Sequence, residues 1–315
     1  MANVITQPRF WKKKAILIKS ETVVGEDAIP TGALDWIEAR NVSFQPLDAE
    51  TADRNIEMPY FGNGGKLITG KYATLSFECA LVGPGTAGAA PKIAPVLLAC
   101  AFAETVTADA SVAYSLASEN IGSVTAYINI DGVLHKMVGA RSNASLTLSA
   151  KGIPLLKFEL QSVYLAPVAG AVPAVVKDGW TIEQPVTAAT TSGLVLGATT
   201  LAYSTLEFNL GNQLARIDLP GPQTEVAITD RKPTGSAIVL APPLTEFDPF
   251  ALSDAGTVLA LETTQDTRAG HKVQVDAQVR VIGVEYDRIE EMLAYKLTLE
   301  PTPIAGNDEL TLTYL

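Results

Sequence analysis

Strict alternation of apolar and polar residues is the feature that most constrains the fold of this chain. It runs through Leu156–Leu160, Val273–Val281 and Tyr295–Leu299, where every second side chain is apolar. A period of two with one apolar face is typical of antiparallel strands that bury one side. Turn-forming residues separate such runs, namely Asp131-Gly132, Lys151-Gly152, Gly211-Asn212 and Pro220-Gly221-Pro222. We therefore expect a mainly β protein.

Helical periodicity is confined to three short stretches. The clearest is 91–102, a shorter one is 248–253, and a third is 286–293, whose charged residues would face solvent. The pattern predicts a few short helices beside the strands.

The gross order of strands, one helix and further strands recurs on either side of a stretch rich in Pro, Ala and Val, residues 166–176. A local similarity at an offset of 80 positions, between 128–148 and 208–228, supports this weakly. A chain of 315 residues is long enough for one large or two ordinary domains. We predict a first β domain over 1–168, a linker over 169–176, and a second, diverged β domain over 177–315.

Residues 41–70 form a polar, glycine-rich segment between two stretches, 36–44 and 66–82, that read as long strands. Structureless segments of this length are usually functional or disordered. We expect the tip of a projecting hairpin.

The formal net charge of −11 excludes a protein that holds nucleic acid by counterion release, because that mode needs a basic face. Lys12-Lys13-Lys14 is the only basic cluster. It predicts a solvated face or a contact with an acidic partner. The acidic residues of the hairpin of a neighbouring copy, Asp48, Glu50, Asp53 and Glu57, are candidates for that contact.

Two cysteines are present. Cys79 shares a strand face with other apolar residues and Cys100 continues a helical apolar stripe, so both are expected to be buried and reduced, although a disulfide between them stays open. The N-terminal stretch lacks the apolar length of a signal peptide. No apolar run approaches the ~20 residues of a membrane span, so no membrane partner is expected.

Residues Gly83–Gly88 fit the pattern G-x-G-x-x-G between a strand-like and a helix-like run. Glu104 even lies at the distance expected of an acidic ribose ligand. However, Pro84 removes a backbone donor from the supposed phosphate cradle, and Pro91 places the helix start beyond the glycines. We predict a flexible strand-to-helix loop rather than a nucleotide site.

An enzyme would need a recognisable chemical constellation. His135 and His271 lie far apart in sequence, and neither has a nearby cluster of metal-binding spacing. The chain has no G-x-S-x-G motif and no evident nucleophile arrangement. We predict no catalytic, cofactor-binding or metal-binding residues, no cofactor, and a protein that is not an enzyme.

The run from Lys66 to Glu104 resembles the major tail tube proteins of long, non-contractile-tailed (siphovirus-like) bacteriophages. The family pattern is a long strand, a G-x-G-T-A-G-x-x-P loop and a short helix that ends in an "LLxACGF-A"-like run. The matching residues are Gly83, Gly85, Thr86, Ala87, Gly88, Pro91, Leu97, Leu98, Ala99, Cys100 and Phe102. The sequence departs at Ala101, where the family often has glycine. The resemblance is looser over 11–165, and beyond 177 only the general style of a diverged β domain remains.

The resemblance implies two tail-tube-like β-sandwich or partial-barrel domains, each with a flanking short helix. It also implies a structural virion protein that self-assembles into stacked rings, in which sheets of neighbouring domains join edge to edge. The tube would be a conduit for genome ejection. Its partners would be copies of itself, other tail proteins at the tube ends, and a tape measure protein and DNA in the lumen without specific binding. The location would be the virion tail, after assembly in the bacterial cytoplasm.

The residue physics agrees with this picture. Strand edges are a liability unless they are covered, and pairing with a neighbouring copy would cover them. An acidic conduit would repel DNA phosphates and let the genome slide.

Two alternatives stay open at this point. A ring of three two-domain chains with pseudo-sixfold symmetry is favoured over six chains that carry one tube domain each. A carbohydrate- or receptor-binding β-sandwich protein of a virion or cell surface is the alternative function. It would need clustered exposed aromatic residues, whereas Trp11, Trp36 and Trp180 are scattered in the sequence.

Overall fold

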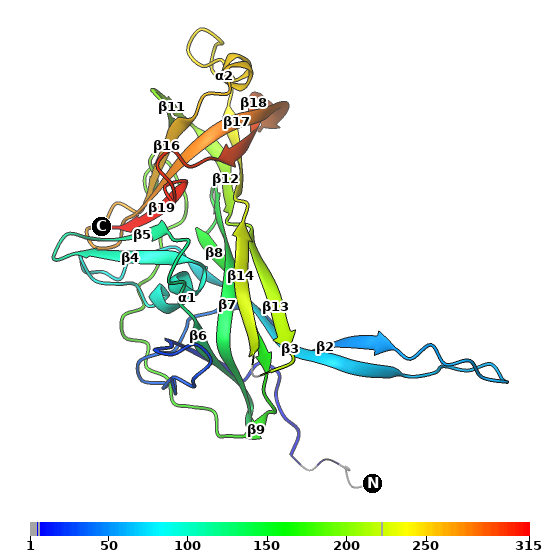
Figure 1. Cartoon of the computed structure of the whole chain (residues 1–315). Helices are drawn as coiled ribbons and strands as arrows, with labels where there is room; N and C mark the ends of the chain where they lie inside the picture. The colour runs from blue at the N-terminus through cyan, green and yellow to red at the C-terminus, as the bar shows by residue number, and fades with distance from the viewer. Residues whose placement is uncertain (1–4, 6, 222) are drawn as a thin grey trace.

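The computed structural model describes residues 5, 7–221 and 223–315, in which nineteen strands and two short helices are present (Figure 1). The prediction of a mainly β protein with one short helix in each half is confirmed. The strands form large antiparallel sheets that do not close into a barrel, which is consistent with a β-sandwich.

The first half of the chain contains ten elements of secondary structure before a long irregular segment. They are β1 (Lys14–Ser20), β2 (Arg40–Asp53), β3 (Lys66–Ala80), α1 (Ala94–Ala99), β4 (Phe102–Thr107), β5 (Ser111–Leu116), β6 (Val124–Ile130), β7 (Val133–Ser149), β8 (Leu155–Tyr164) and the two-residue β9 (Val168–Ala169).

The second half contains eleven elements. They are β10 (Leu194–Leu196), β11 (Thr199–Leu201), β12 (Tyr203–Asn209), β13 (Asn212–Leu219), β14 (Gln223–Arg231), β15 (Thr234–Leu240), α2 (Pro249–Ala255), β16 (Leu259–Gln265), β17 (Val273–Ile289), β18 (Met292–Pro301) and β19 (Leu310–Tyr314).

The three alternating runs lie in β8, β17 and β18, as predicted, with their apolar residues buried. The turns at Asp131-Gly132 and Lys151-Gly152 connect β6 to β7 and β7 to β8. The expected turn at Gly211-Asn212 likewise separates two strands, β12 and β13, although these strands belong to different sheets and are not paired with each other. The Pro220–Pro222 corner connects β13 to β14, and its last residue lies outside the described residues.

The predicted helix over 286–293 was wrong. These residues are the end of β17, a tight turn and the start of β18, and Ile289 pairs with Met292. The turn residues Glu290 and Glu291 both have positive φ angles, 45° and 69°. Two successive positive φ angles are the signature of a two-residue hairpin turn, which here forms without glycine. Pairing with the neighbouring strand therefore overrides the helical spacing of the apolar residues.

The two helices that do form are shorter than predicted or shifted. Helix α1 begins at Ala94, with Pro95 in its first turn, rather than at Pro91. Helix α2 begins after Asp248, whose carboxylate accepts hydrogen bonds from the backbone N–H groups of Phe250 and Ala251, both at 3.0 Å. It ends at Gly256, which has a left-handed backbone.

A long hairpin of β2 and β3 projects from the body of the molecule (Figure 1). Strand β2 continues to Asp53, so only residues 54–65 connect the two strands. The segment 41–70 is therefore less irregular than its composition suggests, because most of it pairs as strand. The tip carries exposed apolar side chains, and Phe61 is fully exposed.

The same succession of paired strands occurs twice along the chain. In the first half β2 pairs with β3, β3 with β8, β8 with β7, β7 with β6 and β6 with β1. In the second half β12 pairs with β15, β15 with β18, β18 with β17, β17 with β16 and β16 with β10. In each half the helix follows the second strand of the succession: α1 comes after β3 and α2 after β15.

The residue registers of the two successions also correspond. Ala73 of β3 pairs with Ser162 of β8, and Gly235 of β15 pairs with Leu299 of β18. From the first half to the second, β3 is thus displaced by 162 positions (73 to 235) and β8 by 137 positions (162 to 299). This correspondence differs from the similarity at an offset of 80, which was wrong as a guide to structure. That offset matches the β6–β7 hairpin to β12, β13 and β14, and β12 is paired with neither β13 nor β14.

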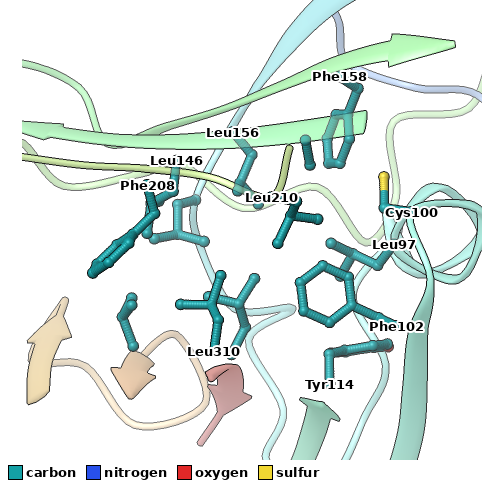
Figure 2. Close-up of a cluster of buried hydrophobic side chains, with 14 of the residues drawn as sticks. Leu97, Cys100, Phe102, Tyr114, Leu146, Leu156, Phe158, Phe208, Leu210 and Leu310 are labelled. Carbon is teal, nitrogen blue, oxygen red and sulfur yellow. The ribbon is translucent and has the colours of Figure 1, made fainter. Parts of the chain in front are cut away.

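The two halves share one hydrophobic core. Figure 2 shows part of this core, where residues of α1, β4, β5, β7 and β8 in the first half meet residues of β12 and β19 in the second. Phe208, Leu210 and Leu310 line the same small void as Leu146 and Leu156. Strand β12 pairs with β7, and β19 pairs with β5, so the sheet also continues from one half into the other.

The segment predicted as a linker, 169–176, runs along the first half. The side-chain amide of Asn129 donates to the carbonyls of Gly170 and Ala171, and the N–H of Val176 donates to the carbonyl of Gly32. The division into domains at 169–176 stays a prediction.

Candidate assembly interfaces

The glycine loop packs against the backbone of the second half. The N–H of Gly83 donates to the carbonyl of His271 and the N–H of Gly85 to that of Gly270, each over 2.9 Å. A Cβ on Gly270 would lie 2.6 Å from the carbonyl carbon of Gly85. The glycines therefore permit a close approach of two backbones. Because the two N–H groups are already used, they do not form an open phosphate cradle.

A charged turn, formed by Asp266 and Arg268, lies next to Gly270 in the second half. Asp266 is buried, and Arg268 binds both of its carboxylate oxygens while it also donates to the carbonyl of Ile182. Burial acts to raise the pKa of Asp266, but the hydrogen bonds and charge of Arg268 outweigh it and hold that pKa below the usual 3.8. The joint between the halves thus contains an ionised carboxylate.

A second polar joint lies beside helix α1 and β19. Arg231, at the end of β14, binds the buried carboxylate of Glu309 through Nε (3.0 Å) and Nη2 (2.7 Å). It also donates to the carbonyl of Ala117. A cavity of about 260 Å³ lies against this pair. The side chain of Asn212, which pairs with Arg231 at the base of the β13–β14 hairpin, donates to the carbonyls of Cys100 and Ser142, so both strands are tied to the first half at this base.

Strand β12 adds to the edge of β7 in an internal seam. The pairing runs from Thr205 opposite Ser149 to Asn209 opposite Ser145. On the core side of the seam, Leu206 and Phe208 are buried. The seam shows how the first strand of one succession joins the fourth strand of the other.

Within the described residues, β2 and β17, the counterparts of the seam strands β12 and β7, each have an edge without a partner. Strand β2 pairs with β3 alone, and residues 283–289 of β17 pair with β18 alone. Backbone N–H and C=O groups on such edges are available to another chain. Exposed apolar side chains lie beside the open β17 edge: Phe250, Ile282, Tyr286, Met292 and Leu293.

The lysine cluster and the acidic hairpin residues lie on different elements of the same chain. Lys14 lies over the ring of Trp11, and Lys13 is 3.6 Å from Asp131. The acidic side chains are partly engaged within the chain, since Arg216 binds Asp48 and Glu50 while Lys66 binds Asp53. The contact between the lysines and these acids of a neighbouring copy stays a prediction.

The residues examined for catalysis are not brought together. His135 contacts Phe44 edge to face, whereas His271 belongs to the glycine-loop joint. Within residues 5, 7–221 and 223–315, no group of three potential ligands capable of holding a metal ion is present. Cys79 and Cys100 are free and buried, and burial raises the pKa of the Cys100 thiol to about 12.

Two of the tryptophans that are scattered in the sequence meet in the structure. Trp180 stacks edge to face on Trp36, with ring centroids 6.1 Å apart, and its Nε1–H donates to the carbonyl of Trp36. Sequence spacing gave no sign of this contact. It fastens the segment after residue 176 to the first half.

Among the described residues, neither helix has the length and apolar character to cross a membrane.

The fold defines a mainly β protein built from two successions of the same paired strands. The family model of the phage tail tube proteins matches residues 11–314, so the chain belongs to the phage tail tube protein family. It is a structural component of the phage tail, in a family that is not a class of enzymes. The resemblance seen in Lys66–Glu104 is thereby confirmed. No curated protein matches the sequence.

Proposed function

We propose that this chain is the repeating subunit of a long, non-contractile phage tail tube and assembles with copies of itself into stacked rings. The observation that carries the proposal is the pair of open edges on two corresponding successions of strands. Closed rings require complementary edges that repeat at a constant rotation. A chain that carries one unpaired donor strand and one unpaired acceptor edge meets that requirement.

Each ring contains three chains in this proposal, which gives six similar units around the axis. The support is the twofold occurrence of the strand order and the internal seam, which already joins two such units. The units correspond to residues 1–168 and 177–315, connected by 169–176. In a six-chain ring with a decorating second domain, nothing would require the second half to repeat the strand order of the first.

Rings stack into a tube through the tips of the β2–β3 hairpins. Ile56, Tyr60 and Phe61 on the tip are exposed, and burial against the next ring would remove this apolar surface from water. Other tail proteins meet the ends of the tube.

The lumen accommodates first the tape measure protein and then DNA, without specific binding to either. The net charge of −11 supports this role, because an acidic conduit does not retain phosphates. Assembly takes place in the cytoplasm of the bacterial host, before the tail joins the virion.

Negative-stain electron microscopy of the purified protein over a range of concentrations tests the proposal. We expect annular particles at low concentration and tubes of constant diameter at high concentration. A protein that stays monomeric in solution, and that antibodies fail to locate along the tails of virions, would contradict it.

A further inference from the structure

At each of the two open edges, a strand lacks a partner that its counterpart in the other succession has. Strand β12 lies between β15 and β7, whereas its counterpart β2 pairs with β3 alone. Strand β7 accepts β12 along residues 145–149, whereas the corresponding end of its counterpart β17 pairs with β18 alone. The missing partner of β2 is thus a strand like β17, and the missing partner of β17 is a strand like β2.

The register of the donor strand follows from the hairpins. Ser43 pairs with Ser76, and Thr205 pairs with Ile238, so that both members are displaced by 162 positions (43 to 205 and 76 to 238). Both strands also have a register shift just before this pair. Residue 207 of β12 therefore corresponds to residue 45 of β2.

The register of the acceptor strand follows from the pairs with β8 and β18. Arg141 pairs with Gln161, and Gly283 pairs with Thr298, which displaces β7 by 142 positions and β8 by 137 (141 to 283 and 161 to 298). A register shift again comes just before each pair. Residue 147 of β7 therefore corresponds to residue 289 of β17.

Side chains beside the open β17 edge give a second, independent indication. Tyr286 is 68% exposed, although its ring lies within 6 Å of those of Phe250 and Tyr295. At the internal seam, the same side of the sheet is covered by Phe208 and Leu210, which are almost fully buried. An exposed aromatic cluster at the corresponding place is what a second copy would cover.

We propose that β2 of one copy adds to the open edge of β17 of the next copy, in the register of the internal seam. Glu207 pairs with Thr147 at that seam, so Gln45 of one chain lies opposite Ile289 of its neighbour. This inference rests on the proposed self-assembly and identifies which strands close the ring. The hairpin tip beyond Asp53 extends past the seam and stays available to the adjacent ring.

Disulfide trapping tests the register. Cysteines at directly opposed positions of antiparallel strands have Cα atoms about 5 Å apart, which suits a disulfide. The double variant Gln45→Cys, Ile289→Cys is oxidised under assembly conditions and run on a non-reducing gel. The matched control is Gln45→Cys, Glu285→Cys, which places the second thiol on the same face about 13 Å along the strand. The native thiols are buried and do not compete.

We expect the first variant to form at least ten times more interchain disulfide than the control. A ladder that ends at three chains supports the seam together with the three-chain ring, and one that ends at six supports the seam alone. Tubes that form normally with no excess of cross-link over the control would overturn the seam and leave the proposed function standing. Absence of both tubes and cross-links would contradict both.

A substitution in the exposed aromatic cluster beside the β17 edge tests the seam separately. Tyr286→Asp alters an exposed side chain, so its urea unfolding midpoint should match that of the parent chain. It should nevertheless fail to form rings at concentrations where the parent assembles. Unchanged ring formation would show that no neighbouring copy covers this cluster and would count against the seam.

Discussion

By the displacement of 162 positions, the outer part of the β2–β3 hairpin, residues 50–69, corresponds to the β13–β14 hairpin, residues 212–231, yet their surroundings differ. The first projects into solvent, with Phe61 fully exposed. The second lies along β7 and β8, with Val226 fully buried. Arg216 of this packed hairpin binds Gln161 of β8 and Asp48 of β2. In the proposed assembly, the difference follows because the β13–β14 hairpin has a neighbouring unit within its own chain, whereas the projecting hairpin would find its neighbour in another copy.

The largest expected contrast is between one buried and one exposed residue of the two hairpins. Val226→Asp should lower the free energy of unfolding by about 4 kcal/mol, because a carboxylate would be buried without a partner. Phe61→Asp should leave it within about 0.5 kcal/mol of the parent and impair tube growth instead. Urea unfolding and sedimentation of tubes measure the two effects. Equal losses of stability in both variants would remove the distinction between the hairpins.

The glycine-loop joint holds the second half against the first and so keeps the packed hairpin in place. Gly270→Ala should cost about 3 kcal/mol of unfolding free energy, since the new Cβ meets Gly85 and the backbone has a φ of +74°. Gly306→Ala is the matched control, with a φ of +94° and no atom within 4 Å of the added Cβ. It should cost about 1 kcal/mol. Similar unfolding curves for the two variants would show that close packing at the joint is unimportant.

The ion pair between Arg231 and Glu309, at the base of the packed hairpin, should contribute more to the free energy of unfolding than the pair between Lys66 and Asp53 on the projecting hairpin. Arg231→Met leaves the buried Glu309 carboxylate unpaired and should cost about 2 to 3 kcal/mol, reduced by water in the adjoining cavity. Lys66→Met removes an ion pair with Asp53 whose side chains are both more than half exposed, and should cost less than about 1 kcal/mol. Thermal unfolding compares them, and a larger loss for Lys66→Met would contradict the assignment.

The dependence of stability on acid pH gives a smaller test, at the glycine-loop joint. The lowered pKa of Asp266 means that its contribution to stability is present above pH 3.8 and is lost as the pH falls through the lower folded-state value. Asp266→Asn removes this titration. The variant should be less stable than the parent near pH 6 and should lose less stability on acidification to pH 3. Parallel stability curves for the two proteins would show that the carboxylate is not stabilised by folding.

The smallest effect is expected from the lysine cluster. Reversal of Lys12, Lys13 and Lys14 to glutamate should raise the concentration needed for tube growth by less than tenfold, because exposed ion pairs contribute little. Reversal of Asp48, Glu50, Asp53 and Glu57 should restore growth if they are the partners. Light scattering at two salt concentrations measures both changes. Growth of the lysine variant that equals the parent at low salt would exclude this contact.

The sequence predicts those parts of the fold that depend on local periodicity. The alternation in β8, β17 and β18 and the turn at Asp131-Gly132 were identified because each signal lies within a few residues. The hairpin at Glu290-Glu291 was missed because neither residue is a usual left-handed turn former. A helix was predicted there because apolar residues happened to recur at helical spacing.

Contacts between distant segments left no readable signal. Leu75 and Leu160 correspond to Ala237 and Leu297 in the second succession, so only apolar character is retained between the halves. The sequence similarity at an offset of 80 therefore indicated the wrong correspondence between the halves, whereas the registers of the paired strands show the repeat. Likewise, the role of Gly83 depends on His271, and nothing near either residue in the sequence indicates the other.

Class averages of single rings viewed down the tube axis distinguish three chains per ring from six. We predict threefold symmetry, with six similar units in which every second boundary is the internal seam and the others join neighbouring chains. Six identical chains in one ring, each with its second half outside the wall, would contradict it.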